Sequence, residues 1–276
     1  MHTSVHDLIG IGIGPFNLGL ACLTEPVEEL DALFLDQRSG FDWHPGMLLE
    51  GAGMQTTFLA DLVTLADPTS RYSFLNFLKQ EGRLYPFYIR EVFFPLRAEF
   101  NAYCQWAAAQ LSSLRFNRRV ASIQHVNGLY RLEVKNTQTG AEEHYLTRKL
   151  VLGTGTEPVV PDCCEAARDR VLHSAAYLDN KLRLQMQPSI TVLGSGQSAA
   201  EIYSDLLQDI DRFGYELNWI TRSPRFFPLE YTKLTLEMTS PEYLDYFHEA
   251  LPRWALAIAC TTDSPRPLPL AAASPF

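Results

Sequence analysis

The sequence has no dense run of basic residues: 23 lysines and arginines stand against 32 acidic residues, for a formal net charge of −9. A nucleic-acid surface needs a basic patch that neutralises phosphates, so this class of partner is disfavoured. Long apolar runs are also missing, because no stretch approaches the ~18 apolar residues of a membrane-spanning helix. The first residues lack the basic and then apolar pattern of a signal peptide. We therefore expect a cytoplasmic protein with neither a nucleic-acid nor a membrane partner.

The sequence also has no Cys-x-x-Cys pair, and its cysteines have no metal-ligand spacing with the seven histidines. The adjacent Cys163 and Cys164 form no exception, since neighbouring cysteines rarely reach disulfide geometry without strain. We expect ordinary reduced thiols and no metal site. The five positions are Cys22, Cys104, Cys163, Cys164 and Cys260.

What the chain does have is a glycine turn close to its start. Leu8 to Ile11 is an apolar run typical of a strand, Gly12-x-Gly14-Pro15 follows, and apolar residues then recur at helical spacing. A dinucleotide pyrophosphate binds at such a helix N-terminus, where a Cβ on either glycine would hold it off. Asn17 stands where the third glycine of the pattern belongs. Alone, the pattern fits a ligand-free turn as well.

Two further features favour the dinucleotide interpretation. The next apolar strand ends in Asp36, an acidic residue about 20 residues after the glycines, where a carboxylate can take both hydroxyls of an adenosine ribose. A second pattern, Gly194-x-Gly196-x-x-Ala199, follows another strand, and the strand after it leads to Arg222 and Arg225. Guanidinium groups there suit the 2′-phosphate of NADPH. We predict FAD at the first turn and NADPH at the second.

These patterns define the expected fold. At 276 residues with 46% hydrophobic residues, the chain can form one or two domains. We predict an α/β protein with two Rossmann-like dinucleotide-binding units, the second incomplete. Alternating segments at residues 118–123, 128–134 and 143–146 predict a small antiparallel sheet, with Asn127-Gly128 as a hairpin turn. Residues 97–111 and 198–210 predict helices, and residues 216–220 predict a strand.

Several longer motifs occur in order. They are Gly12-Ile-Gly-Pro-Phe-Asn-Leu18, Trp43-His-Pro-Gly-Met47, Met54-Gln55 with Phe58-Leu-Ala-Asp-Leu-Val-Thr64, Pro68-Thr-Ser with Ser73-Phe-Leu-Asn76, Leu152-Gly-Thr-Gly155 and Gly194-Ser-Gly-Gln-Ser198. With them the chain resembles the lysine/ornithine N-monooxygenase family, the N-hydroxylating flavin monooxygenases of hydroxamate siderophore biosynthesis. Asn17 matches the family's own third-position residue.

The resemblance implies a reaction and a site. NADPH would reduce FAD, the reduced flavin would take up O2 as a C4a-hydroperoxide, and a neutral primary amine would attack its distal oxygen. Gln55 matches a glutamine that lies against the isoalloxazine ring, and Trp43, His44 and Met47 would line the same face. Gln55 and His44 are therefore candidate catalytic residues. Gly194, Gly196, Gln197 and Ser198 would bind NADPH.

Two departures from the family concern the substrate. The amino-acid hydroxylases have a lysine that holds the substrate α-carboxylate where this chain has Ala60, and a family asparagine falls on Leu236. Without these two polar groups, a substrate carboxylate would be left unpaired in the site. Their loss therefore favours a substrate that has no carboxylate. We predict a diamine, putrescine or cadaverine, over L-lysine or L-ornithine.

The third departure is length, because family members are considerably longer. We expect an FAD-binding domain over residues 1–165, a partial NADPH-binding domain over 166–252 and a non-family, disordered tail over 253–276. An inactive truncated fragment that at most binds FAD therefore stays an alternative. A flavin-dependent reductase of disulfides or quinones is disfavoured by the missing Cys-x-x-Cys. The sequence leaves the oligomeric state open, a homo-oligomer included.

Overall fold

The computed structural model describes residues 4–223, 226, 236–238 and 240–248. These residues belong to two units, one that ends at Phe226 and one that begins after it. The predicted tail over 253–276 lies outside the described residues. In the second unit, residues 241–248 are helical, and Ser240 caps this helix by accepting a hydrogen bond from the Tyr243 N–H at 3.2 Å.

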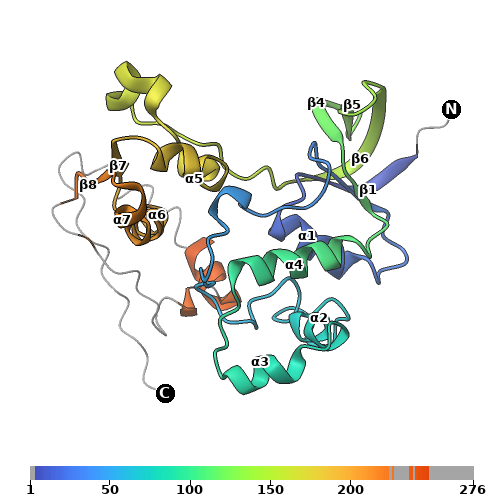
Figure 1. Ribbon diagram of the computed structural model, residues 1–276. Helices are drawn as coiled ribbons and strands as arrows, with labels where there is room; N and C mark the ends of the chain where they lie inside the picture. Colours follow the sequence, from blue (N-terminus) through green and yellow to red (C-terminus); the bar gives the residue numbers. More distant parts are fainter. Residues whose placement is uncertain (1–3, 224–225, 227–235, 239, 249–276) are drawn as a thin grey trace. The chain divides into compact units, whose positions relative to one another are not determined.

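The larger sheet of the first unit has six strands in the order β3-β2-β1-β6-β5-β4. Its strands are β1 (Val5–Ile11), β2 (Ala32–Leu35), β3 (Leu114–Arg115), β4 (Arg118–Val126), β5 (Leu129–Asn136) and β6 (Glu142–Leu152). Figure 1 labels four of them, β1, β4, β5 and β6, at the upper right. The strands β1, β2, β3 and β6 pair in parallel, whereas β4, β5 and β6 pair antiparallel. The α/β fold class predicted from the sequence is confirmed.

The predicted antiparallel strands exist but are not a separate sheet. The segment at 143–146 and the later apolar run at 149–152 are one continuous strand, β6, which pairs with β5 on one side and β1 on the other. The pattern hid this continuity because β6 alternates where it pairs with β5 and becomes apolar, from Leu150 to Leu152, where it pairs with β1 alone. Asn127 and Gly128 both have positive φ, 52° and 77°, as the predicted hairpin turn requires.

Helices cover one face of the sheet. They are α1 (Pro15–Thr24), α2 (Phe74–Gln80), α3 (Leu84–Arg90) and α4 (Arg97–Ala108). Their apolar faces meet β2 in a core rich in aromatic residues, where the Tyr103 ring lies 5.3 Å from Phe74 and 6.0 Å from Phe100. The helix predicted over residues 97–111 is confirmed as α4, and Phe100, Tyr103, Cys104 and Ala107 form its buried face. A smaller apolar cluster with Ile9, Leu35 and Leu132 covers the other face.

The second glycine turn belongs to a smaller parallel sheet. Its strands β7 (Ser189–Leu193) and β8 (Glu216–Ile220) are joined through α6 (Gln197–Gln208) and α7 (Ile210–Phe213), with α5 (Tyr177–Gln185) before β7. Here β8 has the bounds that the sequence predicted. Short 3-10 helices precede this sheet, η1 (Pro45–Met47), η2 (Asp162–Arg170) and η3 (Ser174–Ala176). Met47 and Leu49 pack into the apolar core of the smaller sheet, which joins the loop after β2 to this part of the chain.

The described cysteines are free thiols, and three of the four are buried. Cys22, Cys104, Cys163 and Cys164 are free, and Cys260 lies outside the described residues. Burial raises the pKa of the Cys22 thiol to about 12, and it raises the pKa of Cys104 as well. Among the described residues no helix is long and apolar enough to cross a membrane.

We expect Tyr103→Phe to destabilise the first unit by about 1–2 kcal/mol. The Tyr103 hydroxyl donates to the Tyr72 carbonyl at 2.6 Å and accepts from the Leu62 N–H at 3.3 Å, so its removal leaves a buried carbonyl and an N–H unpaired. Urea unfolding measures the change. Tyr85→Phe is the control because Tyr85 is 73% exposed, and an equal loss in both variants would contradict the assigned role of Tyr103.

Candidate active site

The two glycines of the first turn have different tasks. Gly12 has φ +86°, and a Cβ there would lie 2.4 Å from the Gly153 carbonyl oxygen, so both its conformation and the neighbouring backbone require glycine. Gly14 forms the N-cap of α1 with extended φ, and a Cβ there would meet nothing within 4 Å. No protein atom demands glycine at this position. The open space lies at a helix N-terminus without a side-chain cap, which is where a pyrophosphate binds.

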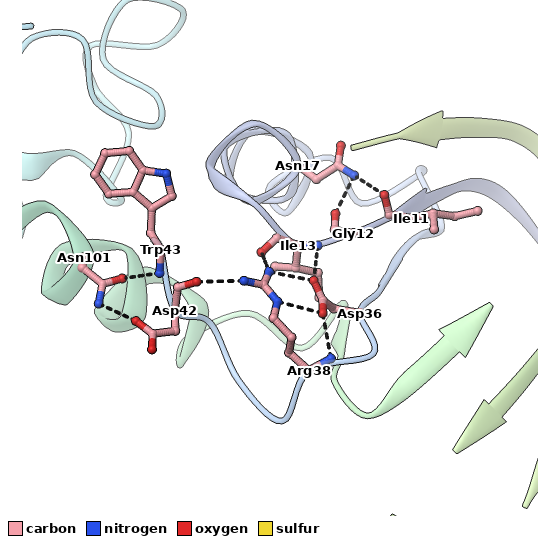
Figure 2. Close-up of polar contacts among 9 residues, drawn as sticks. All are labelled: Ile11, Gly12, Ile13, Asn17, Asp36, Arg38, Asp42, Trp43 and Asn101. Carbon is pink, nitrogen blue, oxygen red and sulfur yellow. Dashed lines mark hydrogen bonds and ion pairs between the residues drawn. The ribbon is translucent and has the colours of Figure 1, made fainter. Parts of the chain in front are cut away.

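Asn17 shapes the turn from inside the protein (Figure 2). Its side chain is buried, and its amide nitrogen donates to the Gly12 carbonyl at 2.7 Å and to the Ile11 carbonyl at 3.3 Å. Pro15 occupies the first turn of α1, where its missing N–H costs nothing. The two residues hold the turn in place, and a third glycine could not supply these hydrogen bonds.

Asp36 follows β2 and is buried beside the same turn. Its carboxylate accepts from the Ile13 N–H at 2.7 Å, from the Arg38 N–H at 2.8 Å, and from Arg38 Nε and Nη2 at 3.0 and 2.8 Å. Burial alone would raise the pKa of Asp36, but the hydrogen bonds from Arg38 and Ile13 outweigh it and lower that pKa. The carboxylate that the sequence assigns to a ribose is thus already hydrogen-bonded by four donors.

The second turn repeats the geometry of the first. Gly194 has φ +126°, whereas a Cβ on Gly196, the N-cap of α6, would meet nothing within 4 Å. The Trp219 Nε1 donates to the Gly194 carbonyl at 2.6 Å and so fixes the turn against β8. Arg222 is exposed just beyond β8, and Arg225 lies outside the described residues.

A cavity of about 550 Å³ lies beside these elements and brings together residues that are far apart in the sequence. Five of the predicted site residues line it, from three separate segments. The lining residues are Trp43, His44, Met47, Met54, Gln55, Thr56, Arg97, Thr156, Glu157, Pro158, His173, Ser174, Ala175 and Ser198. A cavity of this size can hold a drug-sized ring system. The predicted site residue Gln197 turns away toward Glu201, to which its Nε2 donates at 2.8 Å.

His44 faces this cavity in a left-handed conformation, with φ 48°. Its ring packs on Trp43, with 5.1 Å between the ring centroids. Partial burial and the positive charges of Arg97 and Arg38 lower the pKa of His44, which favours the neutral imidazole. A neutral imidazole can accept a proton from a ligand in the cavity.

Ala60, one of the two residues predicted to contact substrate, is not among the residues that line the cavity. Ala60 lines an adjoining crevice, which shares Met54 and Thr56 with the cavity. Asp61 lies beside Ala60, and its carboxylate accepts from the N–H groups of Thr64 and Phe74 at 2.6 and 2.7 Å. Leu236 belongs to the second unit and is 41% exposed there.

Sequence reasoning missed Arg97, the cationic side chain of the cavity. It forms two hydrogen bonds with Glu201 of α6, at 2.7 and 2.8 Å, across 104 residues of sequence. Both side chains are 16% exposed. No local pattern could predict this pair. Gly46 is a second missed residue: a Cβ there would lie 2.0 Å from the Ala175 carbonyl oxygen, so glycine lets η1 approach η3 beside the cavity.

Two strand–glycine–helix units with open N-caps, next to a shared cavity, define the class of two-dinucleotide α/β proteins. The model of the L-lysine 6-monooxygenase/L-ornithine 5-monooxygenase family matches residues 4–256. The chain belongs to this family.

Individual relatives agree with this assignment. The chain is 60% identical over 248 residues to the putrescine N-hydroxylase of Shewanella oneidensis, which covers 89% of this chain and 50% of that protein. Its fold matches the FAD-bound cadaverine monooxygenase of desferrioxamine biosynthesis from Erwinia amylovora, with a TM-score of 0.87 and 62% identity over 93% of this chain and 61% of that one. It also matches an ornithine N-hydroxylase of Kutzneria sp. 744 with reduced FAD, NADP+ and L-ornithine, with a TM-score of 0.78 and 31% identity over 88% and 60% of the chains. The chain spans about half the length of the curated relatives it matches.

We expect Arg97 and Glu201 to couple energetically. Arg97→Met and Glu201→Leu should each cost about 1–3 kcal/mol, and the double variant should cost less than their sum because neither charge is then left unpaired. Urea unfolding of the four proteins gives the coupling energy. The same cycle on Arg118 and Glu143, a similarly exposed pair within the large sheet, is the control. If the unfolding free energies lost in the two single variants add up to the loss in the double variant, Arg97 and Glu201 are not coupled.

Proposed function

We propose that this chain takes part in the FAD- and NADPH-dependent N-hydroxylation of a diamine, putrescine or cadaverine, in the cytoplasmic biosynthesis of a hydroxamate siderophore. NADPH supplies two electrons, one atom of O2 becomes the hydroxyl oxygen on nitrogen, and the other leaves as water. The observation that carries this proposal is the cavity, which gathers Trp43, His44 and Gln55 with Ser198, the residue that follows the second glycine turn.

The residues fit the cofactors. FAD would lie with its pyrophosphate in the open space at Gly14 and its ring system in the cavity against Gln55 and Trp43. NADPH would bind at Gly196 and Ser198, with Arg222 and Arg225 toward its 2′-phosphate. When bound, the flavin activates O2 for transfer to a nucleophile. The relatives with FAD, and with FAD and NADP+ together, support both assignments.

The protein residues would orient the reactants and handle protons. Gln55 would hydrogen-bond the flavin ring, while Trp43 and Met47 would exclude water from it. The amine must be neutral to act as a nucleophile, and His44, whose lowered pKa favours an uncharged imidazole, would accept a hydrogen bond from it in the cavity.

The crevice next to the cavity supports a diamine as substrate. Ala60 offers no cation for an α-carboxylate, and none of the other described residues around the crevice is cationic. An amino acid whose carboxylate approached Ala60 would find no cationic partner there, at a cost large enough to decide specificity. The names of the relatives that act on putrescine and cadaverine point the same way.

The proposal is tested by incubating the purified protein with FAD, NADPH, O2 and one amine at a time. We expect a hydroxylamine from putrescine or cadaverine, and none from L-lysine or L-ornithine. Product from an amino acid alone would overturn the diamine assignment. Tight FAD binding without product from any amine would identify the chain as a fragment that binds the cofactor only.

Ala60→Lys should lower kcat/KM for the diamine by about 10-fold or more, because the introduced ammonium group would repel the charged, non-reacting end of the diamine. Ala60→Met is the matched control, since it adds similar length without charge. Initial rates of hydroxylamine formation measure both. If Met and Lys reduce the rate equally, size rather than charge matters at this position.

Gly14→Ala should weaken FAD binding by about 10-fold or more while leaving stability unchanged, because its Cβ would enter the space proposed for the pyrophosphate and touch no protein atom. Gly12→Ala should instead destabilise the fold by about 2 kcal/mol or more. FAD titration and urea unfolding separate the two effects. Unchanged FAD affinity in Gly14→Ala would argue against this location for the pyrophosphate.

A further inference from the structure

Arg38 stands at the centre of a chain of polar contacts that no sequence motif indicated (Figure 2). Its guanidinium donates to the Asp36 carboxylate through Nε and Nη2, to the Ile13 carbonyl through Nη2 at 2.8 Å, and to the Asp42 carbonyl through Nη1 at 2.8 Å. These partners belong to three segments: the glycine turn, the end of β2 and the loop that leads to Trp43. One side chain therefore joins the turn to that loop.

The contacts at the turn affect its polarity. The carbonyl oxygens of Ile11 and Gly12 accept from Asn17, and that of Ile13 accepts from Arg38. Three consecutive carbonyls are thus engaged by protein donors. A carbonyl oxygen that faced the open space at Gly14 would repel a pyrophosphate, whereas N–H groups attract it. Arg38 donates the hydrogen bond to the last of these carbonyls, that of Ile13.

The contacts with Asp36 affect its charge. A carboxylate has about four acceptor sites, and Asp36 has four donors, three of them from Arg38. Without the guanidinium, a buried negative charge would lie next to a turn that must accept an anion. With it, the pair is neutral. The acceptor sites of Asp36 are then committed to the protein rather than open to ribose hydroxyls.

The far end of the chain of contacts reaches the cavity. Asn101 of α4 is buried, donates to the Asp42 carboxylate at 2.9 Å and accepts from the Trp43 N–H at 2.9 Å. Arg38 holds the Asp42 carbonyl from the opposite side. The backbone that carries Trp43 and His44 into the cavity is therefore fixed between the glycine turn and α4.

We propose that Arg38 is a positioning residue for the flavin: paired with Asp36, it turns the Ile13 carbonyl away from the pyrophosphate and fixes the loop that carries Trp43 and His44. Asp36 acts through Arg38 and does not bind the ribose itself. This proposal rests on the proposed function because it requires that FAD binds at this turn.

Four variants test it: Arg38→Met, Asp36→Asn, the double variant, and Arg148→Met as control. Arg148 forms an exposed pair with Asp7, which lies near the start of β1. We expect Arg38→Met to raise the Kd for FAD about 10- to 100-fold, as expected for lost charge-assisted hydrogen bonds. The double variant should regain part of this affinity because it no longer buries an unpaired carboxylate. Arg148→Met should bind as the unchanged protein does.

The opposite pattern would overturn the proposal. If Asp36 bound the ribose directly, Asp36→Asn would lose as much affinity as the double variant, and Arg38→Met would retain most of it. Hydrogen exchange of the ligand-free protein provides a readout that does not need FAD. Arg38→Met should speed exchange about 10-fold at residues 13–18 and 42–44, whereas Arg148→Met should leave exchange unchanged in both ranges. Faster exchange in a protein that binds no FAD would refute the proposed function and support the positioning role, whereas unchanged exchange would refute that role.

Discussion

The contact on which the rest of this structure depends is between two pieces of backbone, at Gly12 and Gly153. A Cβ on Gly12 would lie 2.4 Å from the Gly153 carbonyl oxygen, and a Cβ on Gly153 would lie 2.5 Å from Nδ2 of Asn17. The parallel pairing of β1 with β6 ends at this point, where the Gly153 N–H donates to the Ile11 carbonyl at 2.8 Å. The three residues form one close-packed turn that leaves Gly14 facing open space.

This contact also explains why β6 is long. Its first half pairs with β5 in the antiparallel part of the sheet, and its second half delivers Gly153 to the glycine turn. The chain then continues through Thr156, Glu157 and Pro158, which line the cavity. One strand therefore joins the antiparallel strands, the first dinucleotide unit and the wall of the cavity.

The sequence predicted what depends on local patterns. The strand–glycine–helix units, the strand β8 and the Asn127-Gly128 turn follow from residue types within a few positions, because glycine conformation and apolar spacing are local properties. Resemblance to a family added Trp43, His44, Met47, Gln55 and Ser198, and all five meet at the cavity.

What the sequence did not predict depends on distant partners. Arg97 and Glu201 are 104 residues apart, and neither belongs to a recognisable pattern. Asp36 was identified by its position after β2, but the pattern could not reveal that Arg38, two residues later, occupies its carboxylate. A polar residue at a predicted site therefore needs a count of its donors before a ligand is assigned to it.

The same count at Asp61 clarifies how the crevice beside Ala60 would select a substrate. Asp61 accepts from three N–H groups, those of Val63, Thr64 and Phe74, and from the Thr64 hydroxyl, so its carboxylate is fully used by the loop that carries Ala60. It offers no free acceptor to a second ammonium group. On the proposed function, this crevice disfavours amino acids because it offers no cation to their carboxylate. It does not select the diamine through a dedicated anion. Rejecting a carboxylate that would be buried unpaired is the stronger form of discrimination, whereas simple amines of similar length are separated only by the smaller energies of apolar contact.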